Sequence, residues 1–282
     1  MRIRGAAVVI LLAPAMAAMA VLYVIPLGVY FINSFHRFLD GRILPVWTLQ
    51  TYVEYFTDSF TYKVMGTTLR LSLLVTVLSI VIGYPLAYAL HTRVRSAAAK
   101  GLLALLLFSP LLVSVVVRTY GWLILLAGTG VVNTLLRGLG IIDQPLNLLF
   151  NMTGVVISLT HILLPFAIFP MYSVMSRLDL SLKEAAHDLG AGWWDTFKHV
   201  TLPLTMPGIV AGALICFTLA LSAFVTPRLL GGGRVQVMPL MVYNNTVDIN
   251  WPTGAVSGLV LLLMSIAAVW TLNSLLRRLP SV

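Results

Sequence analysis

Charged side chains are scarce in this sequence. Asp, Glu, Lys and Arg make up 10% of its 282 residues, against about 25% in an ordinary soluble domain. Hydrophobic residues make up 59% of the chain. Such a chain cannot cover itself with water-compatible side chains, so the composition excludes a soluble globular protein and indicates an integral membrane protein. The net charge of +9 comes from Arg and Lys residues that flank apolar runs. This placement indicates loops at lipid headgroups and argues against nucleic-acid binding.

The residue patterns of common catalytic sites are also missing. The single cysteine, Cys216, excludes an intramolecular disulfide and lies within an apolar run, as a small core residue would. No Gly-x-x-x-x-Gly-Lys-Ser/Thr segment is present, so we do not expect this chain to bind or hydrolyse ATP. The five histidines have no metal-ligand spacing. His161 lies within an apolar run, where an interhelical hydrogen bond is a commoner explanation than a functional role.

Long apolar runs dominate what is present. Seven stretches of 17 residues or more contain no Asp, Glu, Lys or Arg. A helix needs about 20 apolar residues to cross a bilayer, and six of the stretches are predicted to cross. The seventh, residues 119–136, is interrupted by glycines and Asn133, and we interpret it as a short interfacial helix followed by a second short helix. We therefore expect an all-α membrane protein with one transmembrane domain over 1–282 and spans at about 8–32, 66–91, 101–120, 148–175, 206–229 and 254–276.

Basic residues favour a cytoplasmic location for both termini. Arg2, Arg4, the tight loop 93–100 and Arg277-Arg278 all fall on one side of the membrane when six segments cross. The whole-chain tally of Lys and Arg is ten inside against eight outside, so the short juxtamembrane loops decide the orientation. The first run also contains an Ala-x-Ala pattern at 15–17, which makes a cleaved signal peptide an alternative to the uncleaved first helix that its length favours.

Prolines and the long segment before the second span add two further expectations. Segment 33–69 is aromatic and carries Asp40, Glu54 and Asp58, which suits contact with a soluble partner; a solvated loop with an aromatic belt is the alternative. Prolines within the expected spans predict kinks that neighbouring helices or water accommodate. These are Pro14, Pro26, Pro85, Pro110, Pro165 and Pro170.

Residues 181–203 form a polar loop between two apolar runs. Ser181 and Glu184 have the spacing of a capping box, and Gly190 is placed to end the helix in a left-handed conformation. Trp193, Trp194 and Phe197 are then predicted to form a second short amphipathic element, with Pro207 near the start of the next span. By composition alone, the loop is either a stiff contact for a partner protein or an amphipathic helix on the inner leaflet.

The polar loop resembles the cytoplasmic segment through which permeases of ATP-binding cassette (ABC) importers contact their ATPase. The family pattern is Glu-Ala-Ala, three residues, Gly, nine residues, Ile, one residue, Leu-Pro. At matching spacing this chain has Glu184, Ala185, Ala186, Gly190, Leu202 and Pro203, with Val200 in place of Ile. Other segments resemble permeases of the spermidine/putrescine importer type. These are Gly83-Tyr84-Pro85-Leu86-Ala87-Tyr88, Arg118-Thr119-Tyr120-Gly121-Trp122, Phe224–Gly232, and Asn250-Trp251-Pro252 followed by Gly254-Ala255.

This resemblance to type I ABC importer permeases implies a fold, a location and partners. It implies six transmembrane helices with a cytoplasmic coupling loop at about 180–203, in a multi-pass protein of the bacterial inner membrane. It implies an ATPase dimer, a second permease and a periplasmic solute-binding protein as partners. ATP and Mg²⁺ would bind the ATPase, with no cofactor, metal or catalytic residue on this chain. The residues implied in ATPase contact are Glu184, Ala185, Ala186, Gly190, Trp193, Leu202 and Pro203.

A solute pathway is predicted beside the second, third and fifth spans, where polar groups and kinks interrupt apolar helices. Arg118 and Arg228 stand at the outer ends of expected spans, where an interfacial anchor is the alternative to an outer gate or a binding-protein docking surface. The residues predicted to line or gate the pathway are Tyr84, Tyr88, Ser109, Arg118, Tyr120, Trp122, Ser222, Phe224, Thr226 and Arg228.

The resemblance implies a polyamine or a related amine as the transported solute. None of the nine acidic residues lies in the middle of an expected span. Cation–π contacts with pathway aromatics, or acids on the partner permease, would then have to accommodate a polycation. The alternatives are the same importer class carrying an opine, an amino-acid derivative or an aminophosphonate, or an intramembrane enzyme.

Overall fold

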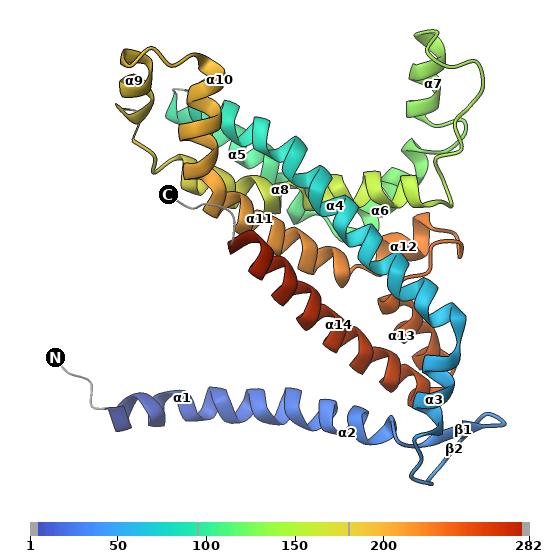
Figure 1. The fold of residues 1–282 in the computed structure, drawn as a ribbon. Helices are drawn as coiled ribbons and strands as arrows, with labels where there is room; N and C mark the ends of the chain where they lie inside the picture. Colours follow the sequence, from blue (N-terminus) through green and yellow to red (C-terminus); the bar gives the residue numbers. More distant parts are fainter. Residues whose placement is uncertain (1–4, 95, 180, 278–282) are drawn as a thin grey trace. The chain divides into compact units, whose positions relative to one another are not determined.

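The computed structural model describes residues 5–94, 96–179 and 181–277 (Figure 1). Most of this described chain is helical, as expected of an all-α membrane protein. The chain divides into two compact units, Met1–Lys63 with Met241–Leu262 and Val64–Leu240 with Leu263–Val282. The boundaries cut through three helices, α4 (Ser59–Thr92), α13 (Met238–Val247) and α14 (Trp251–Arg277).

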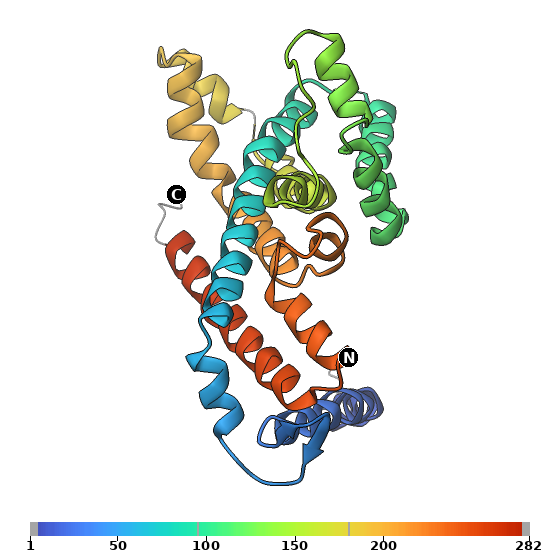
Figure 2. The same ribbon diagram turned by 90° about the vertical axis from the view of Figure 1, so that its right-hand side faces the viewer.

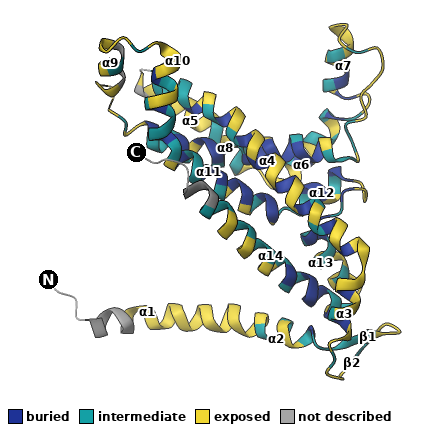
Figure 3. Cartoon of the chain, in the orientation of Figure 1, coloured by how far each residue is buried: buried dark blue, intermediate teal, exposed yellow. Residues whose placement is uncertain are grey.

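The first unit begins with an apolar helix made of three consecutive pieces. They are α1 (Gly5–Met19), a π-helical turn η1 (Ala20–Val24) and α2 (Ile25–Asn33). Pro26 cannot donate a backbone hydrogen bond, and the wide turn just before it accommodates its ring. Figure 3 shows most of the coloured part of this helix as exposed, with a few partly buried residues in α2, as expected of a surface that faces lipid or another chain. The rest of the unit contains α3 (Gln50–Thr57), the first residues of α4, most of α13 (Met238–Val247) and the first half of α14.

A small hairpin in the first unit departs from the expected all-helical chain. Strands β1 (Arg37–Leu39) and β2 (Arg42–Leu44) pair antiparallel, with Leu39 opposite Arg42. The two linking residues, Asp40 and Gly41, have φ angles of 48° and 75°. Positive φ at both central positions is the requirement of a type I′ turn, and Asp-Gly is a preferred sequence for it.

The second unit is a bundle around α8 (Met152–Met175) and α11 (Leu202–Leu221), shown from two sides in Figures 1 and 2. Its other helices are α4, α5 (Ala97–Phe108), the 3₁₀ turn η2 (Ser109–Leu112), α6 (Val115–Leu125), α7 (Val131–Gly138), α9 (Ser181–Asp188), α10 (Trp193–Thr196), the π-helical turn η3 (Phe197–Thr201) and α12 (Val225–Leu230).

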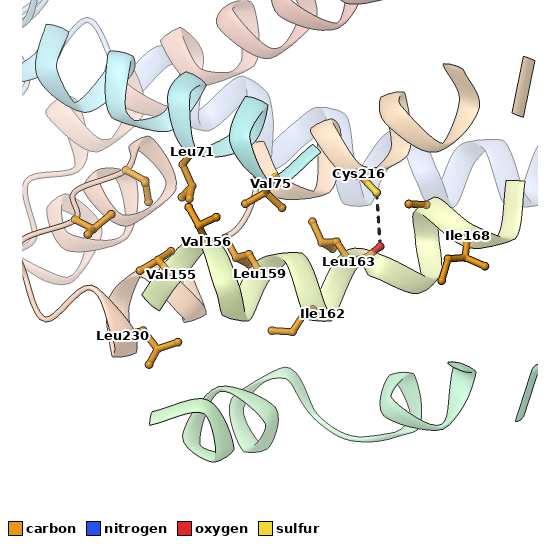
Figure 4. Packing of buried hydrophobic residues seen from close by; sticks show 14 of the residues in the cluster. Leu71, Val75, Val155, Val156, Leu159, Ile162, Leu163, Ile168, Cys216 and Leu230 are labelled. Carbon is orange, nitrogen blue, oxygen red and sulfur yellow. Dashed lines mark hydrogen bonds between the residues drawn. The ribbon is translucent and has the colours of Figure 1, made fainter. Parts of the chain in front are cut away.

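The core of this unit lies where α8 meets α4 and α11. Figure 4 shows Val155, Leu159 and Leu163 of α8 among buried side chains, and the Cys216 thiol donates to the Leu163 carbonyl at 3.6 Å. The expectation of a core cysteine is confirmed. Small residues let α8 and α11 approach closely: a Cβ at Gly208 would lie 2.9 Å from the Met171 Cα. Packing of backbones against small residues is a common way for membrane helices to associate.

Two expected spans are interrupted. The third was predicted as one helix over 101–120, but α5 with η2 and α6 meet at an angle of 96°. Pro110 lies in η2, Val113 is extended and the Ser114 hydroxyl accepts the Val116 N–H at 3.3 Å, so the chain stops one helix and caps the next. The fifth was predicted to reach residue 229, but α11 ends at Leu221 and α12 begins at Val225. Most of the prolines expected in spans lie inside helices, whereas Pro110 falls at this break.

In the described residues, five helices are long and apolar enough to cross a membrane, or six if the bent pair around residue 113 is one span. The five are Leu11–Asn33, Ser59–Thr92, Met152–Met175, Trp193–Leu221 and Trp251–Ser274. The two short helices predicted within 119–136 are present as α6 and α7, although α6 starts at Val115 and α7 continues to Gly138.

Candidate functional site

The polar loop begins with α9, whose first residue, Ser181, forms hydrogen bonds with Asp179. The Asp179 carboxylate accepts the Ser181 N–H at 3.0 Å and also a hydrogen bond from the Ser181 side chain. These bonds favour the ionised form and lower the pKa of this exposed carboxyl group. The Ser181 hydroxyl thus donates to Asp179, and the bond that the sequence predicts from the Glu184 amide to this hydroxyl stays a prediction. The Glu184 side chain lies outside the described residues, so its part of the capping box stays a prediction.

The predicted left-handed stop at Gly190 is confirmed. Its φ is +84°, and the Ala191 N–H donates to the Ala186 carbonyl at 3.0 Å. This bond closes a Schellman turn, in which the second residue beyond the helix returns to a carbonyl in its last turn. A residue with a Cβ is strained at this φ, so glycine fixes where α9 ends.

Three aromatic side chains stack after this turn. The rings of Trp193 and Phe197 are 5.7 Å apart and nearly parallel, and Trp194 lies 5.6 Å from Phe197. The prediction of a separate short element is wrong, because α10, η3 and α11 run without a break as one helix from Trp193 to Leu221. Pro203 occupies the first turn of α11 and Pro207 lies inside it, so Pro207 does not start the helix. The wide π-helical turn lets the helix pass into the proline-containing segment.

The aromatic stack is connected to α4 through Tyr84. The Tyr84 ring meets Phe197 edge-on at 6.0 Å, and its hydroxyl lies 3.0 Å from the Thr205 hydroxyl. Within the second unit, α9 and α10 lie near the end at which α4 and α8 finish (Figures 1 and 2). Tyr84, predicted to line the pathway, therefore contacts the segment that follows the polar loop.

A cavity of about 390 Å³ lies toward the other end of α8, between α6, α8, α11 and α12. We call it the α6–α12 cavity. Ser222, Ala223 and Phe224 enter it from the break between α11 and α12, and Thr226 enters from α12. Apolar residues of α8 complete most of the wall. These residues line the cavity because α11 stops at Leu221 and the chain turns before α12 begins.

Arg118 is the charged residue of this cavity wall. Its Nε and Nη1 atoms are buried and make no hydrogen bond within the described chain. The side chain as a whole is only partly buried, so the cost of desolvation falls on these two nitrogens, which a hydrogen-bond acceptor entering the cavity would satisfy. Next to it, the hydroxyls of Thr119 and Thr226 lie 3.2 Å apart. Thr119 donates to the Val115 carbonyl, so Thr226 donates to Thr119 and joins α12 to α6.

The structure thus gathers four predicted pathway residues, Arg118, Ser222, Phe224 and Thr226, in one cavity. Trp122 lies outside this lining: its indole N–H donates to His161 Nδ1 at 3.2 Å. The expected explanation for His161, an interhelical hydrogen bond between α6 and α8, is confirmed. The other predicted pathway residues that do not line the cavity are Tyr84, Tyr88, Ser109, Tyr120 and Arg228.

Two polar residues that position this end of the unit were missed in the sequence. Asn133 is fully buried, donates to the Ala127 and Leu146 carbonyls and accepts the Leu146 N–H at 2.7 Å. It fastens the loop before α8, although its position in an apolar run suggested only a helix break. Thr68 accepts the Met238 N–H at 2.8 Å and so fixes the start of α13 against α4. The spacing of buried hydroxyls along α4, every three or four residues, is the signal that could have indicated this face.

The polar loop, the broken helices and the helical bundle together define a membrane transport subunit of the permease class. The chain belongs to the family described as binding-protein-dependent transport system inner membrane component, whose model matches residues 25–279. It is therefore a multi-pass inner-membrane transport component and not an enzyme. The resemblance to ABC importer permeases noted in the sequence is confirmed.

Several characterised proteins are similar to this chain over most of its length. The spermidine/putrescine transport system permease protein PotB of Escherichia coli is 34% identical over 237 residues, covering 83% of this chain and 85% of that protein. PotB of Haemophilus influenzae is 34% identical and covers 82% and 81%. The chloroplastic sulfate permease 2 of Chlamydomonas reinhardtii is 28% identical and covers 85% and 62%. The relatives thus include permeases whose names give solutes of opposite charge.

Solved structures support the same fold. A chain of a bacterial ABC transporter that imports the acidic polysaccharide alginate matches with a TM-score of 0.80 at 18% identity, covering 96% of this chain and 95% of that chain. The same kind of transporter in complex with an alginate pentasaccharide-bound periplasmic protein matches with a TM-score of 0.74, covering 96% and 94%. The all-α permease fold is therefore confirmed.

Proposed function

We propose that this chain is one of two permease subunits in an ATP-driven importer for a polyamine or a related organic amine. The observation that carries the cargo class is the 34% identity to the spermidine/putrescine permease over 83% of this chain. The matching of the Glu-Ala-Ala pattern, and the stop at Gly190, support the ATPase contact. The partners are an ATPase dimer that holds ATP and Mg²⁺, a second permease and a periplasmic solute-binding protein.

In this proposal the polar loop is the coupling segment. Glu184, Ala185 and Ala186 lie on α9 with Gly190 at its end, and the stack of Trp193 follows directly. Leu202 and Pro203 form the first turn of α11, which continues from α10 in one helix, so movement of α10 reaches the membrane segment directly. With this loop in the cytoplasm and the bent pair around residue 113 counted as one span, both termini also lie there. Reporter fusions at the two termini and at residue 40 test this orientation.

The α6–α12 cavity is proposed as part of the solute pathway, with Arg118 at its wall. An amine cannot accept a hydrogen bond from the two buried guanidinium nitrogens, so we assign a carboxylate of the second permease as their partner. The partner carboxylate would also neutralise the positive charge of Arg118, which would otherwise repel a cationic solute in the pathway.

The test of the proposed function is co-purification followed by transport. The tagged chain should bring down an ATPase and a second permease, and the reconstituted complex with its binding protein should take up labelled putrescine or spermidine at the expense of ATP. A parallel screen should include an opine, an amino acid and an aminophosphonate. Uptake of one of these without polyamine uptake would replace the cargo class, and activity of the chain alone would contradict the importer.

A further inference from the structure

A second cavity, of about 200 Å³, lies in the first unit between α3, the start of α4, α13 and α14. We call it the α3–α13 cavity. It is lined by Thr51, Glu54 and Tyr55 of α3, by Asp58 and Thr61, and by Met241 and Thr253 of the two later helices. It is separate from the α6–α12 cavity, with which it shares no residue. Its wall carries two carboxylates and several hydroxyls, which is a different chemistry from the largely apolar wall around Arg118.

Each carboxylate has one oxygen held and one oxygen free. Glu54 Oε1 accepts from the Gln50 side chain at 2.8 Å, and Asp58 Oδ1 accepts the Phe60 N–H at 2.9 Å. These bonds fix the orientation of both groups, because Asp58 ends α3 and caps the first turn of α4. Within the described chain the second oxygen of each carboxylate makes no hydrogen bond.

Thr61 supplies an independent indication of a ligand. It is 1% exposed, it lines the cavity, and its Oγ1 has no hydrogen-bond partner in the described chain. A buried hydroxyl without a partner is uncommon and costs about 1–3 kcal/mol. Threonine hydroxyls inside helices usually donate to the carbonyl four residues earlier, as Thr68 does to Val64 in the same helix. Thr61 does not, so its hydroxyl is left for a group inside the cavity.

We propose that the α3–α13 cavity binds a primary ammonium group. An ammonium has three N–H donors and no acceptor, and the cavity wall offers three unpartnered oxygens, one each on Glu54, Asp58 and Thr61. Two negative charges favour a monovalent or divalent organic cation. The buried ring of Tyr55 closes one side. A calcium ion takes six to eight oxygen ligands, so three free oxygens suit it poorly.

This inference rests on the proposed function, because an amine cargo is what would bring an ammonium group to this unit. The site would then hold one end of the amine before or after it reaches the membrane helices. Transport specificity would be set in two places, by the binding protein and by this cavity. The hydrogen-bonding geometry also predicts a preference for primary amines over quaternary ammonium ions of equal charge, which cannot donate.

The experiment is carboxylate footprinting of the complete importer in nanodiscs with a diazo ester, which esterifies carboxyl groups without an amine nucleophile and so does not react through putrescine. Peptide mass spectrometry gives the labelling rate at each carboxylate with and without putrescine. We expect putrescine to slow labelling of Glu54 and Asp58 at least threefold, and to leave the exposed Asp40 of the same unit unchanged. Tetramethylammonium at the same ionic strength should protect neither residue. Labelling of Glu54 and Asp58 that is unaffected by putrescine, or equally reduced by tetramethylammonium, would overturn the proposal.

Two variants distinguish specific binding in the α3–α13 cavity from general attraction of a cation to acidic residues. Thr61→Val removes the hydroxyl with little change in shape and should raise the half-protecting putrescine concentration about tenfold, as expected for loss of a hydrogen bond to a charged group. Thr57→Val is the matched control, because the Thr57 hydroxyl is satisfied by the Val53 and Glu54 carbonyls. Equal protection in both variants would count against the site. Putrescine uptake by the wild-type importer is measured in parallel: protection without uptake would refute the cargo and keep the site, whereas uptake without protection would refute the site alone.

Discussion

The hydroxyl groups of Tyr84 and Thr205 lie 3.0 Å apart, joining α4 to the helix that follows the polar loop. The contact is reinforced by the edge-on ring contact between Tyr84 and Phe197. Tyr84 therefore connects two membrane helices at the end where the ATPase is proposed to bind. If movement of the loop is transmitted into the bundle, this pair is on its route.

Tyr84→Phe should weaken that connection while leaving the ring contact in place. Loss of one neutral hydrogen bond corresponds to about 0.5–1.5 kcal/mol, so solute-stimulated ATPase activity should fall partially and basal activity should not change. Tyr84→Ala should cost more, because it also removes the contact with Phe197. Tyr23→Phe, at a position 65% exposed on the first helix, is the control. Equal stimulation in Tyr84→Ala and wild type would show that the pair does not transmit motion.

Changes in α9 should uncouple the ATPase without unfolding the membrane helices. Glu184→Ala should loosen α9 by about 0.5–2 kcal/mol if the predicted capping box forms. Gly190→Val should be worse, because a β-branched residue is strained at a φ of +84°. Gly190→Asn is the control, since asparagine tolerates this conformation. The measurement is solute-stimulated ATPase in the reconstituted complex; full stimulation in both Glu184→Ala and Gly190→Val would contradict a coupling role.

Filling the α6–α12 cavity should block transport. Tryptophan at Ser222 or Ala223 places a large ring in a space of about 390 Å³, so labelled-solute uptake should fall at least tenfold while the complex still assembles. Val81→Trp is the control, because Val81 is 62% exposed on α4 and does not line the cavity. Wild-type uptake with tryptophan at both positions would place the pathway elsewhere.

Arg118 and Arg228 can be tested by exchange for lysine. Lysine keeps the charge but loses the planar, two-pronged hydrogen-bonding pattern of arginine. Because Nε and Nη1 of Arg118 are buried at the cavity wall, Arg118→Lys should lower uptake about tenfold or more. Arg228, exposed on α12, should show a smaller effect if it contacts the binding protein. Wild-type uptake by both variants would return both residues to simple interfacial anchors.

Close packing of α8 against α11 predicts a stability effect. An added methyl at Gly208 would lie 2.9 Å from the Met171 Cα and the Pro170 carbonyl oxygen. Because the neighbouring atoms are backbone, they cannot move aside, and Gly208→Ala should destabilise the bundle by about 1–3 kcal/mol. Gly66→Ala, with nothing within 4 Å of the new methyl, should leave the melting temperature of the purified complex unchanged or higher. An unchanged melting temperature in Gly208→Ala would mean that the two helices can separate locally.

The sequence predicted those features that depend on local chemistry or on composition. Gly190 ended its helix as expected because a left-handed stop is a property of one residue and its two neighbours. The burial of Cys216 and the hydrogen bond of His161 followed from their positions in apolar runs. The sequence did not predict that the third span is interrupted at Val113 or that α11 ends at Leu221, because apolar residues continue on both sides of each break. Pro110 and the Ser114 cap mark the first break locally, whereas the end of α11 depends on how α12 packs against α6 and α8, which no single segment encodes.

The Asp40-Gly41 hairpin and the environment of Arg118 could not be predicted from the sequence, for two different reasons. The turn had a recognisable Asp-Gly signal, but its flanking strands are only three residues long, too short for an alternating pattern to stand out. Arg118 was identified as a candidate, yet only the tertiary structure shows that two of its nitrogens are buried. The residues that share the cavity with Arg118 lie up to about a hundred positions away in the sequence. The break after α11 places residues 222–226 beside it.

The uninterrupted helix from Trp193 to Leu221 sets a scale for motion. Its 29 residues correspond to about 43 Å at a rise of about 1.5 Å per residue. A tilt of only about 5° at the aromatic stack would displace the other end by about 4 Å, roughly the width of an alkyl chain. That end carries Ser222 and the wall of the α6–α12 cavity. A small angular step at the ATPase would thus be geometrically sufficient to open or close the cavity to an extended amine.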